Sequence, residues 1–148
     1  MKNHIWTILF IVIVGAIITA AAFSINRSVN VTVGGNELNM LVAGNAYTQA
    51  RGLSGIELED LKADGMIFTF NNQEERTFWM KGMEFNLDVV WVQNGKVMKI
   101  DRNVPEPLSG EEPERMYSRP FEVDMVLEFP AGFIDDHDIL IGQMVIVE

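Results

Sequence analysis

Four side chains in the middle of the chain have the types and spacing of a small-ligand site. They are Arg51, Trp79, Lys81 and Asp88. In a strand running from Thr77 to Lys81, Trp79 and Lys81 share one face and would form an aromatic wall with a cationic head. That pair suits an anionic or sugar-like ligand. The alternative is that Trp79 covers the core and the lysine stem lies along it, with its charge in water.

Asp88 and Arg51 each have a structural alternative to ligand binding. Asp88 lies in an apolar run, and an unpaired carboxylate is too costly to bury. Lys81 and Arg51 are its natural partners, so Asp88 predicts either a structural ion pair or a polar site with perturbed pKa values. Arg51 could bind an anionic group, or it could satisfy carbonyl groups at the end of a helix.

Nucleophilic catalysis has little support in the composition. The chain has no cysteine, which excludes a thiol enzyme, disulfides and thiolate metal sites. It has two histidines, His4 and His137, and nothing places His137 beside a serine as its base. Hydrolysis by paired carboxylates remains an alternative. The acidic residues available for it are Asp64, Glu84, Asp88 and Glu128.

We expect no metal and no cofactor. The densest group of potential metal ligands is residues 135–138, which read Asp-Asp-His-Asp. Calcium loops space their oxygen ligands at alternate positions around a sharp glycine turn, and four consecutive ligands cannot all point inward. A polar helical turn is the better interpretation of this segment.

An uncharged N-terminal run predicts a membrane anchor. Residues 5–23 carry no charge and would span roughly 28 Å as a helix, close to the thickness of a bilayer core. Lys2 precedes this run, which favours a cytoplasmic N-terminus and an extracytoplasmic domain. The alternative is a cleaved signal peptide, for which Ala20-Ala21-Ala22 offers small residues, but the run is longer than a usual signal core.

The sequence therefore divides into an anchor or signal segment, residues 1–27, and an exported domain, residues 28–148. The whole chain has 11 basic and 21 acidic residues and a net charge of −10. The exported part keeps nine of the basic residues and all of the acidic ones, so its net charge is −12. Nucleic acid is excluded as a partner by this charge. The expected partners are the lipid bilayer, through residues 5–23, and a small molecule or envelope protein.

Short alternating runs predict a mainly β domain. Residues 29–33 and 37–42 flank Gly34-Gly35 as in a hairpin, and Asn45 would begin a short helix that ends near Gly52. Further strands are predicted at 66–70, 76–81, 87–93, 96–101, 123–129 and 143–147. Between them we expect a polar turn at 71–75 and a type I′ turn at Asn94-Gly95. An irregular loop is predicted at 103–120 and a helical turn within 133–141. The fold class is an antiparallel distorted barrel or sandwich with one or two short helices, preceded by a single transmembrane helix.

An ordered series of motifs resembles the domain of unknown function 192 family. The motifs are Arg51–Gly55, Asp64–Phe68, Phe78–Met83, Leu87–Trp91, Val126–Gly132 and Ile141-Gly142, and the match runs from about Val29 to Val147. The resemblance implies a barrel-like β fold in an often exported or anchored protein, with no agreed activity. The chain departs from the family at Asn86, where proline is common, at Gln143, where aspartate is common, and near Pro105, where many relatives carry a cysteine.

These observations favour a membrane-anchored, extracytoplasmic β domain that is not an enzyme. It would bind a small ligand or an envelope partner through Arg51, Trp79, Lys81 and Asp88. The alternatives are a carboxylate-dependent envelope hydrolase and a purely structural or assembly module. Two carboxylates about 5–10 Å apart across a cleft would favour the hydrolase. A pocket beside Trp79 and Lys81 without such a pair would favour binding.

Overall fold

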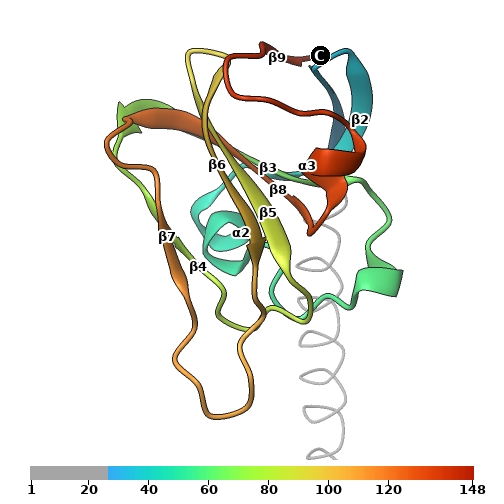
Figure 1. Cartoon of the computed structure of the whole chain (residues 1–148), viewed down its shortest axis with the longest axis vertical. Helices are drawn as coiled ribbons and strands as arrows, with labels where there is room; N and C mark the ends of the chain where they lie inside the picture. The colour runs from blue at the N-terminus through green and yellow to red at the C-terminus, as the bar shows by residue number, and fades with distance from the viewer. Residues whose placement is uncertain (1–26) are drawn as a thin grey trace, which may run out of the picture.

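The computed structural model describes residues 27–148, which form a curled half-barrel sheet with two short α-helices (Figure 1). The transmembrane helix expected at residues 5–23 lies outside the described residues. Within residues 27–148, no helix combines the length and the apolar character needed to cross a bilayer. The expectation of a mainly β domain with one or two short helices is confirmed.

Seven strands make the main sheet, and two more form a separate ribbon. The sheet order is β6-β5-β8-β3-β2-β1-β9, and β4 pairs with β7. The strands are β1 Ser28–Val33, β2 Asn36–Ala43, β3 Gly65–Glu74, β4 Thr77–Trp79, β5 Leu87–Gln93, β6 Lys96–Val104, β7 Arg115–Tyr117, β8 Val123–Pro130 and β9 Val145–Val147. The helices are α2 Ala46–Arg51 and α3 Phe133–Asp136, with a 3₁₀ turn, η1, at Leu58–Asp60.

The helix start and the hairpin turns predicted from local sequence signals are present in the structure. Asn45 caps α2 with a full capping box: its side chain accepts from the amide of Thr48, whose hydroxyl accepts from the amide of Asn45. Asn94 and Gly95 have φ values of 51° and 70°, as a type I′ turn between β5 and β6 requires. The hairpin of β1 and β2 likewise turns at its two glycines.

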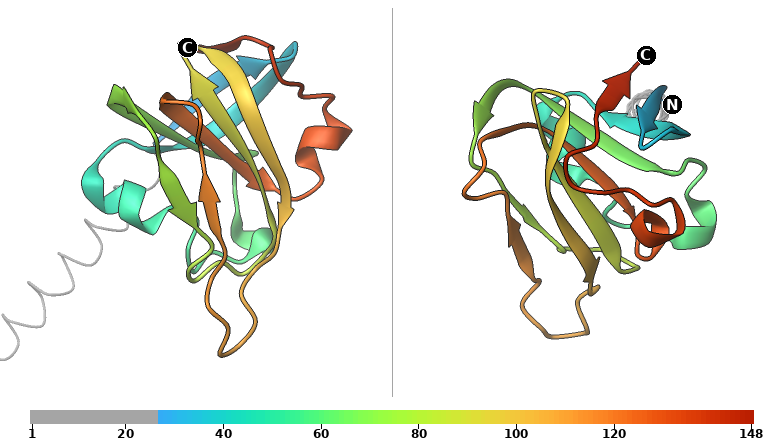
Figure 2. Two further views of the ribbon diagram at one scale, coloured as in Figure 1. Left: turned by 60° about the vertical axis from the view of Figure 1, so that its left-hand side comes forward. Right: turned by 45° about the horizontal axis from the view of Figure 1, so that its top comes forward.

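One pair of strands departs from the antiparallel expectation. β2 and β3 run parallel, with Met40 beside Gly65 and Ala43 beside Phe68. Residues 44–64, which include α2 and η1, make the crossover that a parallel pair needs. This crossover carries α2 to the side of the sheet on which the ribbon of β4 and β7 lies, while α3 lies on the other side (Figure 2).

Two segments expected to be irregular are partly strand. β3 continues through most of the predicted turn at residues 71–75 and ends at Glu74. The predicted loop at 103–120 contains β7, in which Met116 faces Phe78 of β4. Neither strand is visible in the local pattern, because each depends on a partner strand that is distant in sequence.

The central strands are buried on both faces. On one face, Val89 and Trp91 of β5 pack with Phe68 and Val126. On the other face, Val90 and Val92 pack with residues of β3, β8 and α3. Because neighbouring residues of a strand point to opposite faces, this division decides on which side of the sheet each polar residue lies.

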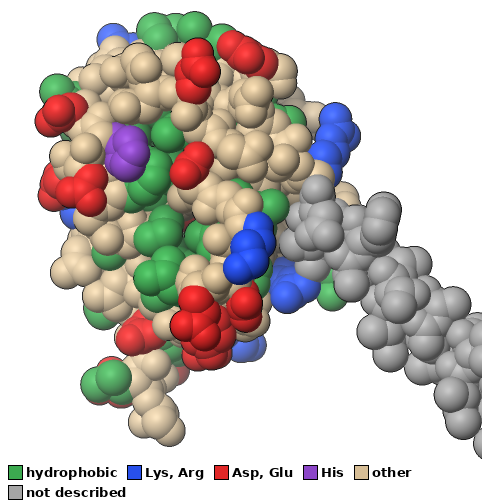
Figure 3. All heavy atoms as spheres, turned by 90° about the vertical axis from the view of Figure 1, so that its right-hand side faces the viewer, with side chains coloured by type: hydrophobic (Ala, Val, Ile, Leu, Met, Phe, Trp, Pro, Cys, Tyr) green, Lys and Arg blue, Asp and Glu red, His purple; other side chains and the backbone are tan. Residues whose placement is uncertain are grey.

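The surface around α3 carries acidic side chains and an imidazole (Figure 3). His137 stacks on Phe133, and its Nδ1 lies 2.9 Å from the carbonyl oxygen of the same residue. Asp135 pairs with Arg102 at 3.0 Å. In the described part of the chain, no three histidine, cysteine or acidic side chains are grouped as a metal site would require.

Candidate ligand-binding pocket

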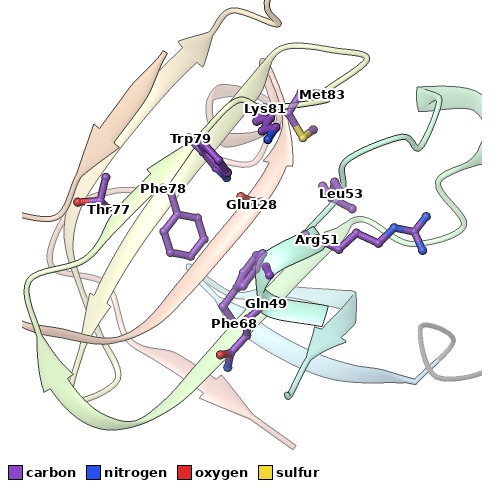
Figure 4. A pocket seen from close by; sticks show the side chains of 12 residues that line it. Gln49, Arg51, Leu53, Phe68, Thr77, Phe78, Trp79, Lys81, Met83 and Glu128 are labelled. Carbon is purple, nitrogen blue, oxygen red and sulfur yellow. The ribbon is translucent and has the colours of Figure 1, made fainter. Parts of the chain in front are cut away.

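A pocket of about 200 Å³ opens on the side of the sheet that carries α2 (Figure 4). The end of α2, β3, β4 and β8 form its walls. Aromatic and aliphatic side chains make much of its surface, with cationic groups and one carboxyl group among them. The lining residues are Gln49, Ala50, Arg51, Gly52, Leu53, Phe68, Thr77, Phe78, Trp79, Lys81, Met83 and Glu128.

Gly52 lets the end of α2 approach the floor of this pocket. It follows the last helical residue with a φ of 55°, a conformation that favours glycine. A Cβ atom at this position would lie 3.4 Å from the ring of Phe68 and 3.6 Å from Oε2 of Glu128. A side chain here would therefore fill the space directly above the carboxyl group.

Glu128 is the buried polar group of the pocket. Its side chain is 4% exposed, and its Oε2 has no hydrogen-bond partner within the described residues. Burial raises the pKa of Glu128 to about 8, because the charged form loses its hydration. At neutral pH the group is therefore mostly a neutral carboxylic acid, which can donate one hydrogen bond and accept others.

Trp79 and Lys81 lie at the rim of the pocket, on the same side of Glu128 (Figure 4). The Lys81 ammonium is 4.9 Å from the centre of the Trp79 ring, and the guanidinium of Arg115 is 5.3 Å from it. The tryptophan is 44% exposed, so its ring remains open to contact. The sequence pattern correctly placed these two side chains together.

The opposite face of β4 also follows the prediction. Phe78 packs edge-on against Phe68 and Trp91, with ring centres 4.9 and 5.5 Å apart. Met80 is fully buried. Both residues therefore contribute to the core, as the alternation from Thr77 to Lys81 indicates.

Arg51 lines the pocket, but its guanidinium extends away from Glu128 (Figure 4). It is the last residue of α2, and its Nε donates to the carbonyl oxygen of Ser54 at 3.4 Å. This geometry matches the structural alternative, in which an arginine satisfies a carbonyl group beyond the helix end.

Asp88 is not part of the pocket. Its Oδ1 accepts from the amide of Asn103 at 2.9 Å, and its Oδ2 accepts from the amides of Gly132 and Ile134 at 2.9 and 3.1 Å. The expected ion pair with Lys81 or Arg51 is not formed among the described residues. On β5, Asp88 points to the α3 face of the sheet, whereas the pocket lies on the opposite face.

Glu128 is the site residue that the sequence pattern did not single out. From the sequence, Glu128 is only one of four acidic residues available to a hydrolase. The feature that could have identified it is the position of this acidic residue between Leu127 and Phe129, in a strand whose two faces are both buried. Among the described residues that line the pocket, Glu128 is the sole carboxyl group, so the pair that a paired-carboxylate hydrolase needs is missing there.

The fold and the site together define a class of domain. It is a curled half-barrel whose pocket contains a buried glutamic acid. The chain belongs to the DUF192 family, described as uncharacterised ACR, which matches residues 29–147. This confirms the family predicted from the motifs and its extent along the chain. A comparison with curated proteins gives no match.

Two solved structures share the fold. One, a "putative transcription regulator" from Sinorhizobium meliloti 1021, has a TM-score of 0.70 at 22% identity and covers 82% of this chain and 94% of that chain. At this identity the likeness shows the fold alone. The other, a protein of unknown function from Novosphingobium aromaticivorans DSM 12444, is 31% identical with a TM-score of 0.62, over 80% of this chain and 83% of that chain.

Proposed function

We propose that the domain binds a small ligand in the Glu128 pocket. The ligand has an apolar body, a hydrogen-bonding group that meets the Glu128 carboxyl and an anionic group beside Lys81. The observation that carries this proposal is the buried, unpartnered Oε2 of Glu128 on the pocket surface. A buried polar atom without a partner costs about 1–3 kcal/mol, and a ligand that supplies the partner recovers that cost.

The other walls suit the same ligand. Phe68 and Phe78 offer aromatic surface to an apolar body. Trp79 and Lys81 offer a ring face and a positive charge at the rim. The lining thus combines apolar side chains with a few convergent polar groups, a combination that small-molecule sites use to hold and orient a ligand.

Binding is favoured over the hydrolase alternative by the single carboxyl group. Hydrolysis of a glycosidic bond uses two carboxyl groups on either side of the scissile bond. The described lining offers Glu128 and no second one. Binding needs only the one neutral donor and the rim cation.

A ligand screen on the full-length chain in detergent tests the proposal. The probes are small carboxylates, sugar acids and phosphate monoesters, and the readout is the shift of the melting temperature on ligand addition. We expect a hit whose affinity is weaker at pH 9 than at pH 6.5, because Glu128 loses its proton in between. Glu128→Gln should remove this pH dependence, and Lys81→Met should weaken binding about tenfold.

Lys96→Met is the matched control, since Lys96 is exposed and lies outside the pocket. It should leave the affinity unchanged. A hit that binds Glu128→Gln and the original chain with the same pH dependence would place its site elsewhere. The absence of any shift across all three probe classes would count against the proposal.

We also propose that residues 5–23 anchor the domain outside the cytoplasm. The support is the uncharged run and the positive charge of Lys2 before it. Because the chain has no cysteine, single cysteines report location cleanly. Ser109→Cys, in an exposed loop, should react with a membrane-impermeant maleimide in intact spheroplasts, whereas Asn3→Cys should react only after lysis. Labelling of both positions only after lysis would overturn the proposal.

A further inference from the structure

A second hollow adjoins the Glu128 pocket. It has a volume of about 240 Å³ and shares Gln49, Thr77 and Phe78 with the pocket. Beyond these residues, Phe70 and residues 74–76 line it. The Glu128 pocket itself holds about 200 Å³, less than the roughly 300–1,000 Å³ of most ligand pockets. A ligand of ordinary size would therefore extend from the pocket into the second hollow.

The pocket and the second hollow follow one another along β3. Phe68 lines the pocket, and Phe70 lines the second hollow. The two rings lie on the same face of the sheet, because their residues are two positions apart in one strand. Both pack with the same core cluster. β3 thus provides a floor common to the two spaces.

The side walls are also common to both spaces. On the helix side, Gln49 ties α2 to β3, since its Nε2 donates to the carbonyl oxygen of Thr69 at 3.0 Å. On the other side, Figure 4 shows the pocket residues of β4 and Lys81 in chain order along one wall. The second hollow continues from the Thr77 end of this wall, away from the cation at the rim.

The charged groups of the second hollow are already paired. Arg76 lies 2.6 Å from Glu74, and Arg119 lies 3.9 Å from Glu75. The guanidinium of Arg76 also lies over the ring of Phe70, at 3.5 Å from its centre. Two carboxylates and two guanidinium groups thus balance one another. The second hollow therefore favours an uncharged part of a ligand.

The same hollow offers hydrogen-bonding groups beside apolar surface. The carboxylates of Glu74 and Glu75 are half-exposed and can accept further hydrogen bonds. Thr77 is exposed, and its hydroxyl can both donate and accept. Phe78 supplies an apolar wall beside them. A neutral ring with several hydroxyl groups and an apolar C–H face, such as a sugar, matches this combination.

We propose that the second hollow binds a neutral sugar unit, so that the ligand is a glycoside of an apolar acid. This inference rests on the proposed function, because the acid unit is the ligand that the Glu128 pocket would hold. The acid unit packs on Phe68 and Phe78 with its anionic group beside Lys81. The sugar unit extends past Thr77, and its hydroxyl groups donate to Glu75.

Isothermal titration calorimetry on the full-length chain in detergent tests this proposal. The probes are para-methoxybenzoate and para-carboxyphenyl glucoside, which share the acid unit and the ether oxygen and differ by the sugar. The glucoside should bind at least about tenfold more tightly, because the sugar adds contacts to an unchanged acid unit. Lys81→Met should weaken both compounds by the same factor, since both place the acid unit at the rim.

Matched variants locate the sugar. Glu75→Ala and Thr77→Val should each weaken the glucoside about fivefold and leave the affinity for para-methoxybenzoate unchanged. Glu122→Ala is the control, since Glu122 is an exposed acidic residue outside both spaces, and it should change neither affinity.

The outcomes separate this inference from the proposed function. Equal affinities for the two compounds would overturn the sugar site and leave the binding of an acid in the Glu128 pocket intact. A glucoside advantage that persists unchanged in both Glu75→Ala and Thr77→Val would place the sugar elsewhere and also overturn the inference. Binding of neither compound would overturn it through its premise, which the ligand screen tests separately.

Discussion

Two buried carboxyl groups on neighbouring strands have opposite surroundings. Asp88 and Glu128 are one register position apart, since Glu128 pairs with Val89. Asp88 accepts three backbone amides on the α3 face, whereas Glu128 has an unpartnered oxygen on the pocket face. The first group therefore stabilises the turn into α3, and the second is available to a ligand.

The free energy of unfolding should depend on pH through the titration of Glu128. Its folded pKa of about 8 lies above the ordinary value of 4.5, so the unfolded chain loses this proton at lower pH than the folded chain. Stability relative to Glu128→Gln should therefore fall as pH rises from about 4.5 to about 8, by up to about 5 kcal/mol, and level off above pH 8. Urea unfolding of both chains at pH 5, 6.5 and 8.5 measures the difference. A difference independent of pH would contradict this expectation.

Asp88→Asn should destabilise the domain by about 3 kcal/mol. An amide has one oxygen in place of two, so it turns an N–H group toward at least one of the three backbone donors. Asp136→Asn is the matched control, since Asp136 is exposed and on α3. Chemical denaturation at pH 7 measures both variants. Equal stabilities would show that the three hydrogen bonds are not important to the fold.

At the scale of elements, the pocket depends on the crossover from β2 to β3. α2 belongs to that crossover and brings Arg51, Gly52 and Leu53 over β8. The crossover returns to the sheet at Gly65, the first residue of β3. A Cβ atom there would lie 2.1 Å from the backbone oxygen of Glu128. The absence of a side chain at this position thus allows β3 to approach β8 beside the pocket.

Gly65→Ala should therefore separate β3 from β8 and cost more than about 2 kcal/mol, because the backbone must move to admit the methyl group. The same substitution should also lower the affinity of the Glu128 pocket for its ligand. Gly44→Ala is the matched change in the same crossover, since a Cβ there meets only a Val42 methyl at 3.4 Å. Thermal unfolding compares the two variants. A larger loss for Gly44→Ala would contradict the proposed packing role of Gly65.

At the scale of the molecule, different elements cover the two sides of the curled sheet. The ribbon of β4 and β7 lies on one side of the sheet, and α3 lies on the other side with acidic side chains around it (Figures 2 and 3). Residues 28–148 carry a net charge of −12. Excess charge of one sign opposes the compact state by self-repulsion, and salt screens this repulsion.

We therefore expect the melting temperature to rise by a few degrees when NaCl increases from about 20 to about 300 mM, a range in which the screening length shortens several-fold. A Glu111→Lys and Glu112→Lys double variant, in the exposed loop before β7, should show a smaller rise. Differential scanning calorimetry measures both. A fall of the melting temperature with salt would show that attractive ion pairs dominate.

Local patterns alone determined the short-range structure. The hairpin of β5 and β6 follows from Asn94-Gly95 between alternating runs, and the start of α2 follows from Asn45. The division of Phe78 and Met80 from Trp79 and Lys81 follows from strand alternation. Each of these features depends on residues within a few positions of one another.

Only the tertiary structure decided which of these elements meet. The parallel pairing of β2 with β3, the pairing of β7 with β4, and the burial of Glu128 all depend on partners distant in the chain. Asp88 and Glu128 look alike in sequence, as acidic residues in apolar strands. The face to which each points, and the amides that reach it, distinguish a fully hydrogen-bonded carboxylate from a buried acid with an unpartnered oxygen, because burial and hydrogen bonding are properties of the assembled sheet.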